Sequence, residues 1–204
     1  KKSGHRRRTK VVRRSRKNLR RTVKRKRLGK GRRRPTRRYS RVQMGGLTDE
    51  ELEELKKNAD GGDKDAQFKL GVMYEFGRGV DQDDGNAKKY YHLAVKKEHT
   101  GAMFNLGLMH EFDTDYITAI KFYKLAAKNG YISAQYRLGN MYSSGKGVTK
   151  NYIEAVRLYK LAAEKEHADA AYELGVMYKL GRGVAMDPVE ASKWFKLAIE
   201  KGNV

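Results

Sequence analysis

Residues 170–198 read AAYELGVMYKLGRGVAMDPVEASKWFKLA, and this stretch decides the fold because recognisable copies of it precede it three times. Each copy contains a Leu-Gly pair, at Leu70-Gly71, Leu106-Gly107, Leu138-Gly139 and Leu174-Gly175, and successive pairs are 36, 32 and 36 residues apart. An alanine lies four residues before each of these leucines. Periods of this length are typical of stacked repeats, in which each unit buries its apolar face against its neighbours. The body of the chain is therefore predicted to be a solenoid.

The first half of each repeat is predicted to form a helix, here called helix A. In repeat one, Ala66, Leu70 and Tyr74 recur at helical spacing and share one face. Gly71 has no side chain and lets another helix approach closely. Gly77 lies where a left-handed residue would end the helix. The aromatic residues that recur in the repeats are predicted to be mostly core.

The second half of each repeat is predicted to form helix B. A capping residue lies four positions before its first alanine in every copy, at Asp83, Asp115, Asn151 and Asp187. Pro188 follows the last of these, at the helical position where proline is tolerated best. Repeat two lacks four residues of the loop between its two helices, yet it retains the cap. Each repeat is thus predicted to be a pair of antiparallel helices.

The two ends of the repeat array differ in sequence. Thr48-Asp49-Glu50-Glu51 has the pattern of a capping box, and Leu47 can staple to Leu52, so a helix is expected before repeat one as the helix B of an incomplete unit. The last helix, expected over Pro188–Lys201, has no successor in this sequence. Its Trp194, Leu197 and Ala198 include positions that a following helix A would cover. We therefore expect this end to abut another chain or a continuation of this one.

These residues carry a resemblance to a known family. The pattern A-x-x-x-L-G-x-x-Y-x-x-G-x-G-V-x-x-D-x-x-x-A-x-x-W/Y-x-x-x-A resembles the Sel1-like repeat over residues 48–204, and repeat two departs from it by its short loop and by His110 at the tyrosine position. The resemblance implies an all-α, right-handed α/α superhelical solenoid similar to tetratricopeptide arrays. It also implies an adaptor or scaffold that binds proteins in its groove, without a catalytic activity.

Charge divides the chain into two parts. The chain has 46 Lys+Arg and 24 Asp+Glu, a formal net charge of +22. Residues 1–41 hold 23 of the Lys and Arg residues and no acid, whereas residues 42–204 hold the other 23 and all 24 acids. We predict a polybasic arm over residues 1–43, a hinge at 44–46 and the solenoid over 47–204. The predicted repeats lie near residues 66–101, 102–133, 134–169 and 170–204.

The arm is the strongest functional signal in the sequence. Its charges repel one another and it has too few apolar residues to fold alone, so it needs a polyanion to order it. Lys and Arg displace counterions from phosphates, which makes RNA or DNA the first candidate partner for residues 1–41. The predicted nucleic-acid-binding residues are Arg6, Arg7, Arg8, Arg13, Arg14, Arg16, Lys17, Arg20, Arg21, Lys24, Arg25, Lys26, Arg27, Arg32, Arg33, Arg34, Arg37 and Arg38.

These features together indicate a non-enzymatic structural scaffold in a large nucleoprotein assembly, either a ribosome-like particle or a nucleoprotein virion. The expected location is intracellular, inside a nuclear, nucleolar, organellar or virion particle. The alternative is a soluble regulatory adaptor, in which Lys24–Arg27 serves as a nuclear address. An acidic membrane surface or an acidic protein is a further alternative partner for the arm.

The sequence offers no convincing catalytic, cofactor or metal site, and none is predicted. The chain has no cysteine, which excludes disulfides and thiolate chemistry. Gly145-Lys146 lacks the spacing and the preceding strand of a phosphate-binding loop, and Asp81–Gly85 departs from the calcium-loop pattern. His99 and His167 occupy the same place in two repeats, which favours a structural role in a turn; His110 is expected to pack in place of a tyrosine. No apolar run approaches the roughly 18 residues of a membrane span, so no insertion is expected.

Overall fold

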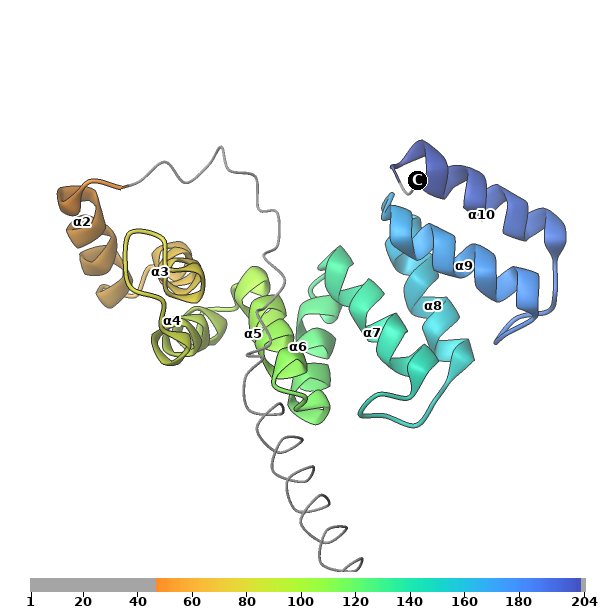
Figure 1. The fold of residues 1–204 in the computed structure, drawn as a ribbon, viewed down its shortest axis with the longest axis horizontal. Coiled ribbons are helices and arrows are strands. Elements are labelled where there is room, and N and C mark those ends of the chain that lie inside the picture. The colour runs from red at the N-terminus through yellow and green to blue at the C-terminus, as the bar shows by residue number, and fades with distance from the viewer. Residues whose placement is uncertain (1–46, 203–204) are drawn as a thin grey trace, which may run out of the picture. The chain divides into compact units, whose positions relative to one another are not determined.

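The computed structural model describes residues 47–202, and this part of the chain is all helix and connecting turns. Each helix packs chiefly on the helices before and after it, so the described residues form the right-handed α/α solenoid that was expected (Figure 1). Helix A of the four repeats is α3, α5, α7 and α9, and helix B is α4, α6, α8 and α10. The helices are α2 (Asp49–Asp60), α3 (Lys64–Phe76), α4 (Asp84–Lys96), α5 (Thr100–Phe112), α6 (Tyr116–Lys128), α7 (Ile132–Ser144), α8 (Tyr152–Ala163), α9 (Ala168–Leu180) and α10 (Pro188–Glu200).

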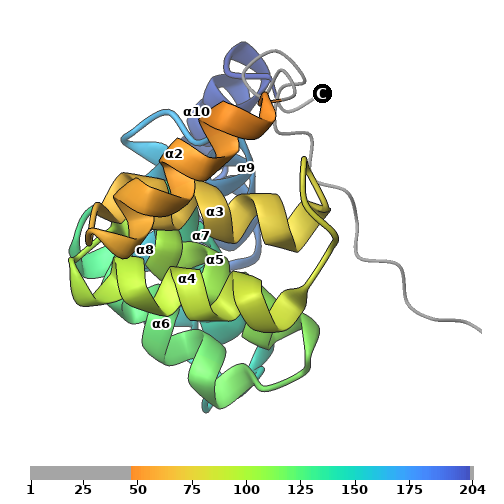
Figure 2. The same ribbon diagram turned by 90° about the vertical axis from the view of Figure 1, so that its left-hand side faces the viewer.

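The predicted leading helix is present as α2. Thr48 caps it, since the Thr48 hydroxyl accepts from the Glu51 N–H at 3.2 Å and the Glu51 carboxylate accepts from the Thr48 N–H at 2.8 Å. Leu47 and Leu52 both pack against the buried cluster that includes Leu70. Figure 2 shows α2 lying along α3, on which it packs. The helix therefore covers repeat one in the way that a preceding helix B would.

An aromatic ring of helix B lies on a helix A glycine in every repeat, and we call this pairing the aromatic–glycine contact. A Cβ atom built on Gly71 would lie 2.5 Å from Cδ1 of Tyr91, a distance that real side chains essentially never show. The ring is fully buried and has no room to withdraw. The close approach predicted at Gly71 is thus confirmed, and its partner is a side chain. The other three pairs are Gly107 with Tyr123, Gly139 with Tyr159 and Gly175 with Phe195, in which the built Cβ atom would lie 2.5, 2.7 and 2.7 Å from Cε1 of the ring.

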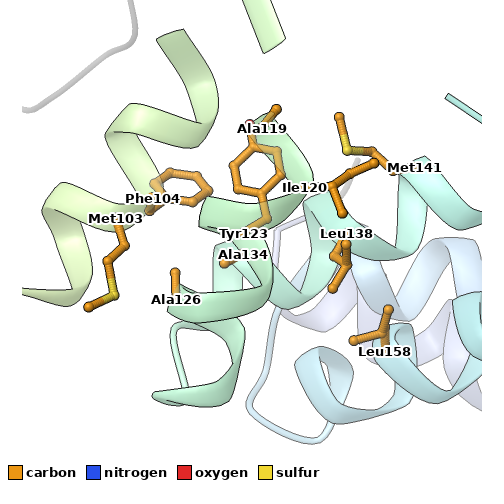
Figure 3. Close-up of a cluster of buried hydrophobic side chains, with 10 residues drawn as sticks. All are labelled: Met103, Phe104, Ala119, Ile120, Tyr123, Ala126, Ala134, Leu138, Met141 and Leu158. Carbon is orange, nitrogen blue, oxygen red and sulfur yellow. The ribbon is translucent and has the colours of Figure 1, made fainter. Parts of the chain in front are cut away.

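The apolar core runs continuously from one repeat to the next. In Figure 3, Phe104 of α5 and Tyr123 of α6 point toward one another, and their ring centroids are 5.7 Å apart. The same buried cluster takes in Leu138 and Met141 of α7 and reaches Leu158 of α8. Two successive repeats therefore share one cluster, as expected for a solenoid whose stability depends on contacts between neighbours.

The helix B caps are confirmed in all four repeats. The side chains of Asp83, Asp115, Asn151 and Asp187 each accept a hydrogen bond from a backbone N–H in the first turn of their helix. Pro188 occupies the first turn of α10, as predicted.

The shortened loop of repeat two closes on the same backbone bond as the longer loops. The Asp115 N–H donates to the carbonyl of His110 at 2.9 Å, and the equivalent bond from Asp83 to Tyr74 is also 2.9 Å. Repeats one, three and four end helix A with a left-handed glycine, as predicted for Gly77, whose φ is 63°. In repeat two Thr114 takes a φ of 63° instead, which is strained for a β-branched residue.

The last helix is the least covered of the helix B set. Only Ala191 and Ala198 are fully buried in α10, whereas α8 buries six residues. Ile199 is 64% exposed, and Ala163 at the equivalent position of α8 is 1% exposed. Trp194 and Leu197, which were expected to include exposed positions, are half-buried, whereas Ile199 and Val189 are the apolar residues that lie open on this helix.

We expect Gly71→Val and Gly175→Val each to lower the free energy of unfolding by about 2–3 kcal/mol, the usual cost of overpacking a core. The new methyl groups would collide with the rings of Tyr91 and Phe195. Urea unfolding followed by circular dichroism measures the loss. Lys146→Ala in an exposed loop is the control and should change stability by less than about 0.5 kcal/mol. A loss that small in either glycine variant would contradict the close-approach role.

Candidate functional site

In the first three repeats the tyrosine of the aromatic–glycine contact makes a hydrogen bond through its hydroxyl to a side chain of helix A. We call these contacts of Tyr91, Tyr123 and Tyr159 the polar ladder, and each of them a rung. In its first rung, Tyr91 Oη donates to Glu75 Oε2 at 2.6 Å and accepts from Asn105 Nδ2 at 3.0 Å. Glu75 is on α3 and Asn105 is on α5, so one hydroxyl connects the helix A elements of two successive repeats. A buried polar group needs such partners, because an unsatisfied one is costly.

The second rung repeats the arrangement with a second carboxylate. Tyr123 Oη donates to Glu111 Oε2 at 2.6 Å, and Arg137 Nη1 of the next repeat lies 3.9 Å from Glu111 Oε1. A carboxylate acceptor and a side chain from the following helix A are therefore common to both rungs.

The third and fourth repeats have no carboxylate acceptor at this place. Tyr159 Oη lies 2.7 Å from Asn140 Oδ1 and 3.1 Å from Ser143 Oγ, so its partners are neutral. Phe195 takes the fourth place and has no hydroxyl to donate. The ladder is thus acidic in repeats one and two, neutral in repeat three and absent from repeat four.

Burial sets the protonation of the groups around the third rung. It raises the pKa of Tyr159 above that of an ordinary phenol, so the hydroxyl remains a donor even in alkaline solution. On α9, burial also raises the pKa of Glu173, and the nearby Asp169 raises it further. Glu173 accordingly holds its proton at higher pH than an exposed glutamate.

The histidines have structural positions, as expected for His99 and His167. The Nδ1 atoms of both cap helix A, accepting from the Ala102 N–H at 3.0 Å and the Ala170 N–H at 3.3 Å. Only a neutral ring can accept in this way. Burial lowers the pKa of both rings and outweighs the opposing effect of Asp65 on His99, so the capping form is favoured.

His110 packs at the tyrosine position, as expected. Its ring stacks on Phe122 with centroids 5.6 Å apart. Its Nδ1 lies 3.2 Å from Asp115 Oδ2, so the histidine also holds the cap of the shortened loop. The tyrosines at the equivalent positions are half-buried rather than central to the core.

Asp81–Gly85, considered above as a metal loop, supplies the cap of α4. Asp83 Oδ1 accepts from the Gly85 N–H at 2.8 Å and the Asn86 N–H at 3.0 Å. Within residues 47–202, no three His, Asp or Glu side chains come close enough together to hold a metal ion. In the same range no helix has the length and apolarity needed to cross a membrane.

The predicted nucleic-acid-binding residues, from Arg6 to Arg38, all lie outside the described residues, as does the predicted hinge at 44–46. The structure therefore places none of them. The site that it does show is the polar ladder, which sequence reasoning missed, since the tyrosines were interpreted as packing alone. One signal was available: the position that holds Glu75, Glu111 and Ser143 holds Lys179 in the repeat where the tyrosine becomes Phe195.

We expect Tyr91→Phe to lower the free energy of unfolding by about 1.5–3 kcal/mol, because it removes a bond to a buried carboxylate. Tyr159→Phe is the matched comparison, since its partners are neutral, and should cost about 0.5–1.5 kcal/mol. Chemical denaturation of the two variants in parallel provides the measurement. Equal losses in both would contradict the difference in charge between the rungs.

Comparison with known proteins divides the solenoid into the same four repeats. The model of the Sel1 repeat family matches residues 64–99, 100–131, 132–167 and 168–203, in register with the predicted repeats but two residues earlier. No curated protein matches the sequence.

Two solved structures are similar over the solenoid. The first is c5321, a protective antigen of uropathogenic Escherichia coli strains with an SLR fold, at 35% identity and a TM-score of 0.72, covering 74% of this chain and 33% of that one. The second is a Sel1 repeat protein from Oxalobacter formigenes, at 31% identity and a TM-score of 0.69, covering 74% of this chain and 62% of that one. The present chain thus matches less than two thirds of either protein. With four matched units over most of its length, the chain belongs to the Sel1 repeat family.

Proposed function

We propose that this chain is a non-enzymatic scaffold of a nucleoprotein assembly, in which the solenoid docks proteins and the basic arm binds RNA or DNA. The Sel1-repeat solenoid by itself indicates a protein–protein interaction scaffold. The single observation that carries the finer proposal is the division of charge, with 23 Lys and Arg residues and no acid in residues 1–41.

The helix A side of the solenoid is the surface we assign to protein docking. The polar ladder places two carboxylates along it, Glu75, which is buried, and Glu111, which is half-buried. Glu111, which Tyr123 holds in place and which remains partly open to solvent, suits an N–H group or a cationic side chain of a partner segment. The open end at α10, with Ile199 exposed, offers a second docking region.

The arm is assigned to the phosphate backbone. Contacts to phosphates position a protein without reading bases, so we expect binding that is strongly salt-dependent and largely independent of sequence. A ribosome-like particle and a nucleoprotein virion both fit a scaffold with such an arm. The alternative, a soluble regulatory adaptor with a nuclear-targeting tail, is favoured by the compact Lys24–Arg27 cluster.

Removal of residues 1–43 should abolish salt-sensitive binding to single-stranded RNA and duplex DNA, because the body has almost no net charge. Fluorescence anisotropy across a range of salt concentrations measures the binding. Circular dichroism of the truncated chain should keep its helical signal. A truncated chain that binds nucleic acid as tightly as the full chain would disprove the assignment of the arm.

Alanine substitution of Lys24–Arg27 separates the two functions of the arm. As a nucleic-acid contact, this cluster is one part of a long basic segment, and its loss should weaken binding only in proportion to the charge removed. As a nuclear address, it should account for nearly all import of a fluorescent fusion. Lost import with near-normal RNA binding would favour the adaptor.

A further inference from the structure

The outer face of α6 carries a stripe of aliphatic and cationic side chains. The stripe consists of the second, sixth, ninth, tenth and thirteenth residues of the helix, which share one face because they are separated by four, three, one and three residues. All five are exposed, and Ile117 is 65% and Leu125 40% exposed. We call this set the outer stripe of α6: Ile117, Lys121, Lys124, Leu125 and Lys128.

Parts of the same stripe recur on the other helix B elements. The exposed aliphatic residue at the second position returns as Ile153 of α8, 72% exposed, and Val189 of α10, 67% exposed. The sixth position holds a cation in all four repeats, and the tenth is always leucine. These residues are Lys89, Arg157 and Lys193, and Leu93, Leu161 and Leu197. The leucines at the tenth position of α4, α8 and α10 are half-buried, so packing accounts for them. The aliphatic residues at the second position and the cations at the sixth are exposed and add little to the core, so packing alone does not account for their recurrence.

The sixth-position cations of α8 and α10 have carboxylate partners, whereas Lys121 of α6 and Lys89 of α4 have none in the part of the chain that the structure describes. Arg157 is held by two hydrogen bonds to Glu154, and Lys193 pairs with Glu190. No ion pair within residues 47–202 involves Lys121, Lys124 or Lys128, and α6 contains no acidic residue. Lys124 lies over the ring of Tyr142 at 5.8 Å. Arg157 and, more weakly, Lys124 lower the pKa of Glu154, so Lys121 and Lys128 carry the charge that is most available to an outside partner.

The chemistry of the stripe selects among polyanions. Nucleic acid offers phosphates, but it gains nothing from aliphatic tips that alternate with the lysines. An anionic membrane needs a continuous apolar surface to insert, whereas Lys121 and Lys124 separate Ile117 from Leu125. An acidic protein helix offers both kinds of contact. Ile117 and Leu125 are about 12 Å apart along the axis, the separation of two turns of a partner helix.

We infer that the outer stripe of α6 is a docking site for an acidic amphipathic helix of a partner protein. The partner's apolar residues pack on Ile117 and Leu125, and its flanking Asp or Glu residues pair with Lys121, Lys124 and Lys128. Charge complementarity carries the choice of occupant. The stripe is separate from the polar ladder, so the site goes beyond the helix A docking proposed above and can fail without affecting it.

The test uses the full chain and two fluorescein-labelled peptides of about 20 residues, long enough to form helices on binding. One peptide places leucine at the first and fourth positions of each heptad and glutamate at most others. The second has the same composition in an order that spreads leucine around the helix. The two peptides carry the same charge, so we expect the basic arm to bind them equally. A difference between their affinities, measured by anisotropy, therefore measures binding to the outer stripe.

We expect the amphipathic peptide to bind about ten-fold more tightly than its scrambled form, as for an interface with a few central contacts. Two double variants should bring the ratio of the two affinities close to one. The first is Ile117→Ser with Leu125→Ser, and the second is Lys121→Glu with Lys124→Glu. Lys64→Glu with Lys179→Glu on helix A is the matched control, also at exposed lysines, and should leave the ratio unchanged. Since all these side chains are exposed, circular dichroism should show the same helical content in every variant.

A ratio near one in the unsubstituted chain would overturn the inference, as would a ratio that the stripe variants do not change. The same variants are also titrated with phosphatidylserine vesicles and with single-stranded RNA. Loss of vesicle or RNA binding on substitution of the stripe, together with a ratio near one, would assign the surface to a membrane or to nucleic acid instead.

Discussion

The aromatic ring that lies on a helix A glycine is the contact on which the rest of the solenoid depends. Glycine within a helix costs about 0.5–1 kcal/mol relative to alanine, and the chain accepts this cost once in every repeat, at Gly71, Gly107, Gly139 and Gly175. Burial of the large ring offsets it. The contact brings the two helices of a repeat close together, and it also brings the Tyr91 and Tyr123 hydroxyls to carboxylates one turn further along helix A. Packing and surface chemistry therefore arise from the same pair of residues.

Much of this architecture was predictable because its signals are local. The caps at Asp83 and Asp187 and the capping box at Thr48 each lie within one turn of the helix that they begin, and all are confirmed. The Leu-Gly pairs recur at the same place in every repeat. The polar ladder was not predicted, because its first rung joins three helices through one hydroxyl. The outer stripe was not predicted either, although its residues lie on one helix. A sequence shows that lysines are present on a helix surface, but only the folded structure shows which of them lack a carboxylate partner. The basic arm remains a prediction from composition.

The near-neutral body distributes its charges unevenly over its surfaces. α2 contains six acids and two lysines, whereas α6 contains three lysines and no acid. The carboxylates of the polar ladder lie in the first two repeats, and apolar residues remain open on α10. A scaffold that binds several partners at once needs such separate surfaces, because sites that differ in chemistry reject one another's ligands. The proposed arm would add a fourth kind of contact, to the phosphates of RNA or DNA.

Amide hydrogen exchange of the Gly107→Ala variant, compared helix by helix with the unsubstituted chain, tests the role of the aromatic–glycine contact most directly. The added methyl group would lie 2.5 Å from the ring of Tyr123. In a repeat protein the damage should stay with the altered unit and its neighbours. The account predicts that α5 and α6 lose the most protection, that α4 and α7 lose less, and that α9 and α10 are unchanged. Unchanged protection in α5 and α6, or an equal loss in every helix, would contradict it.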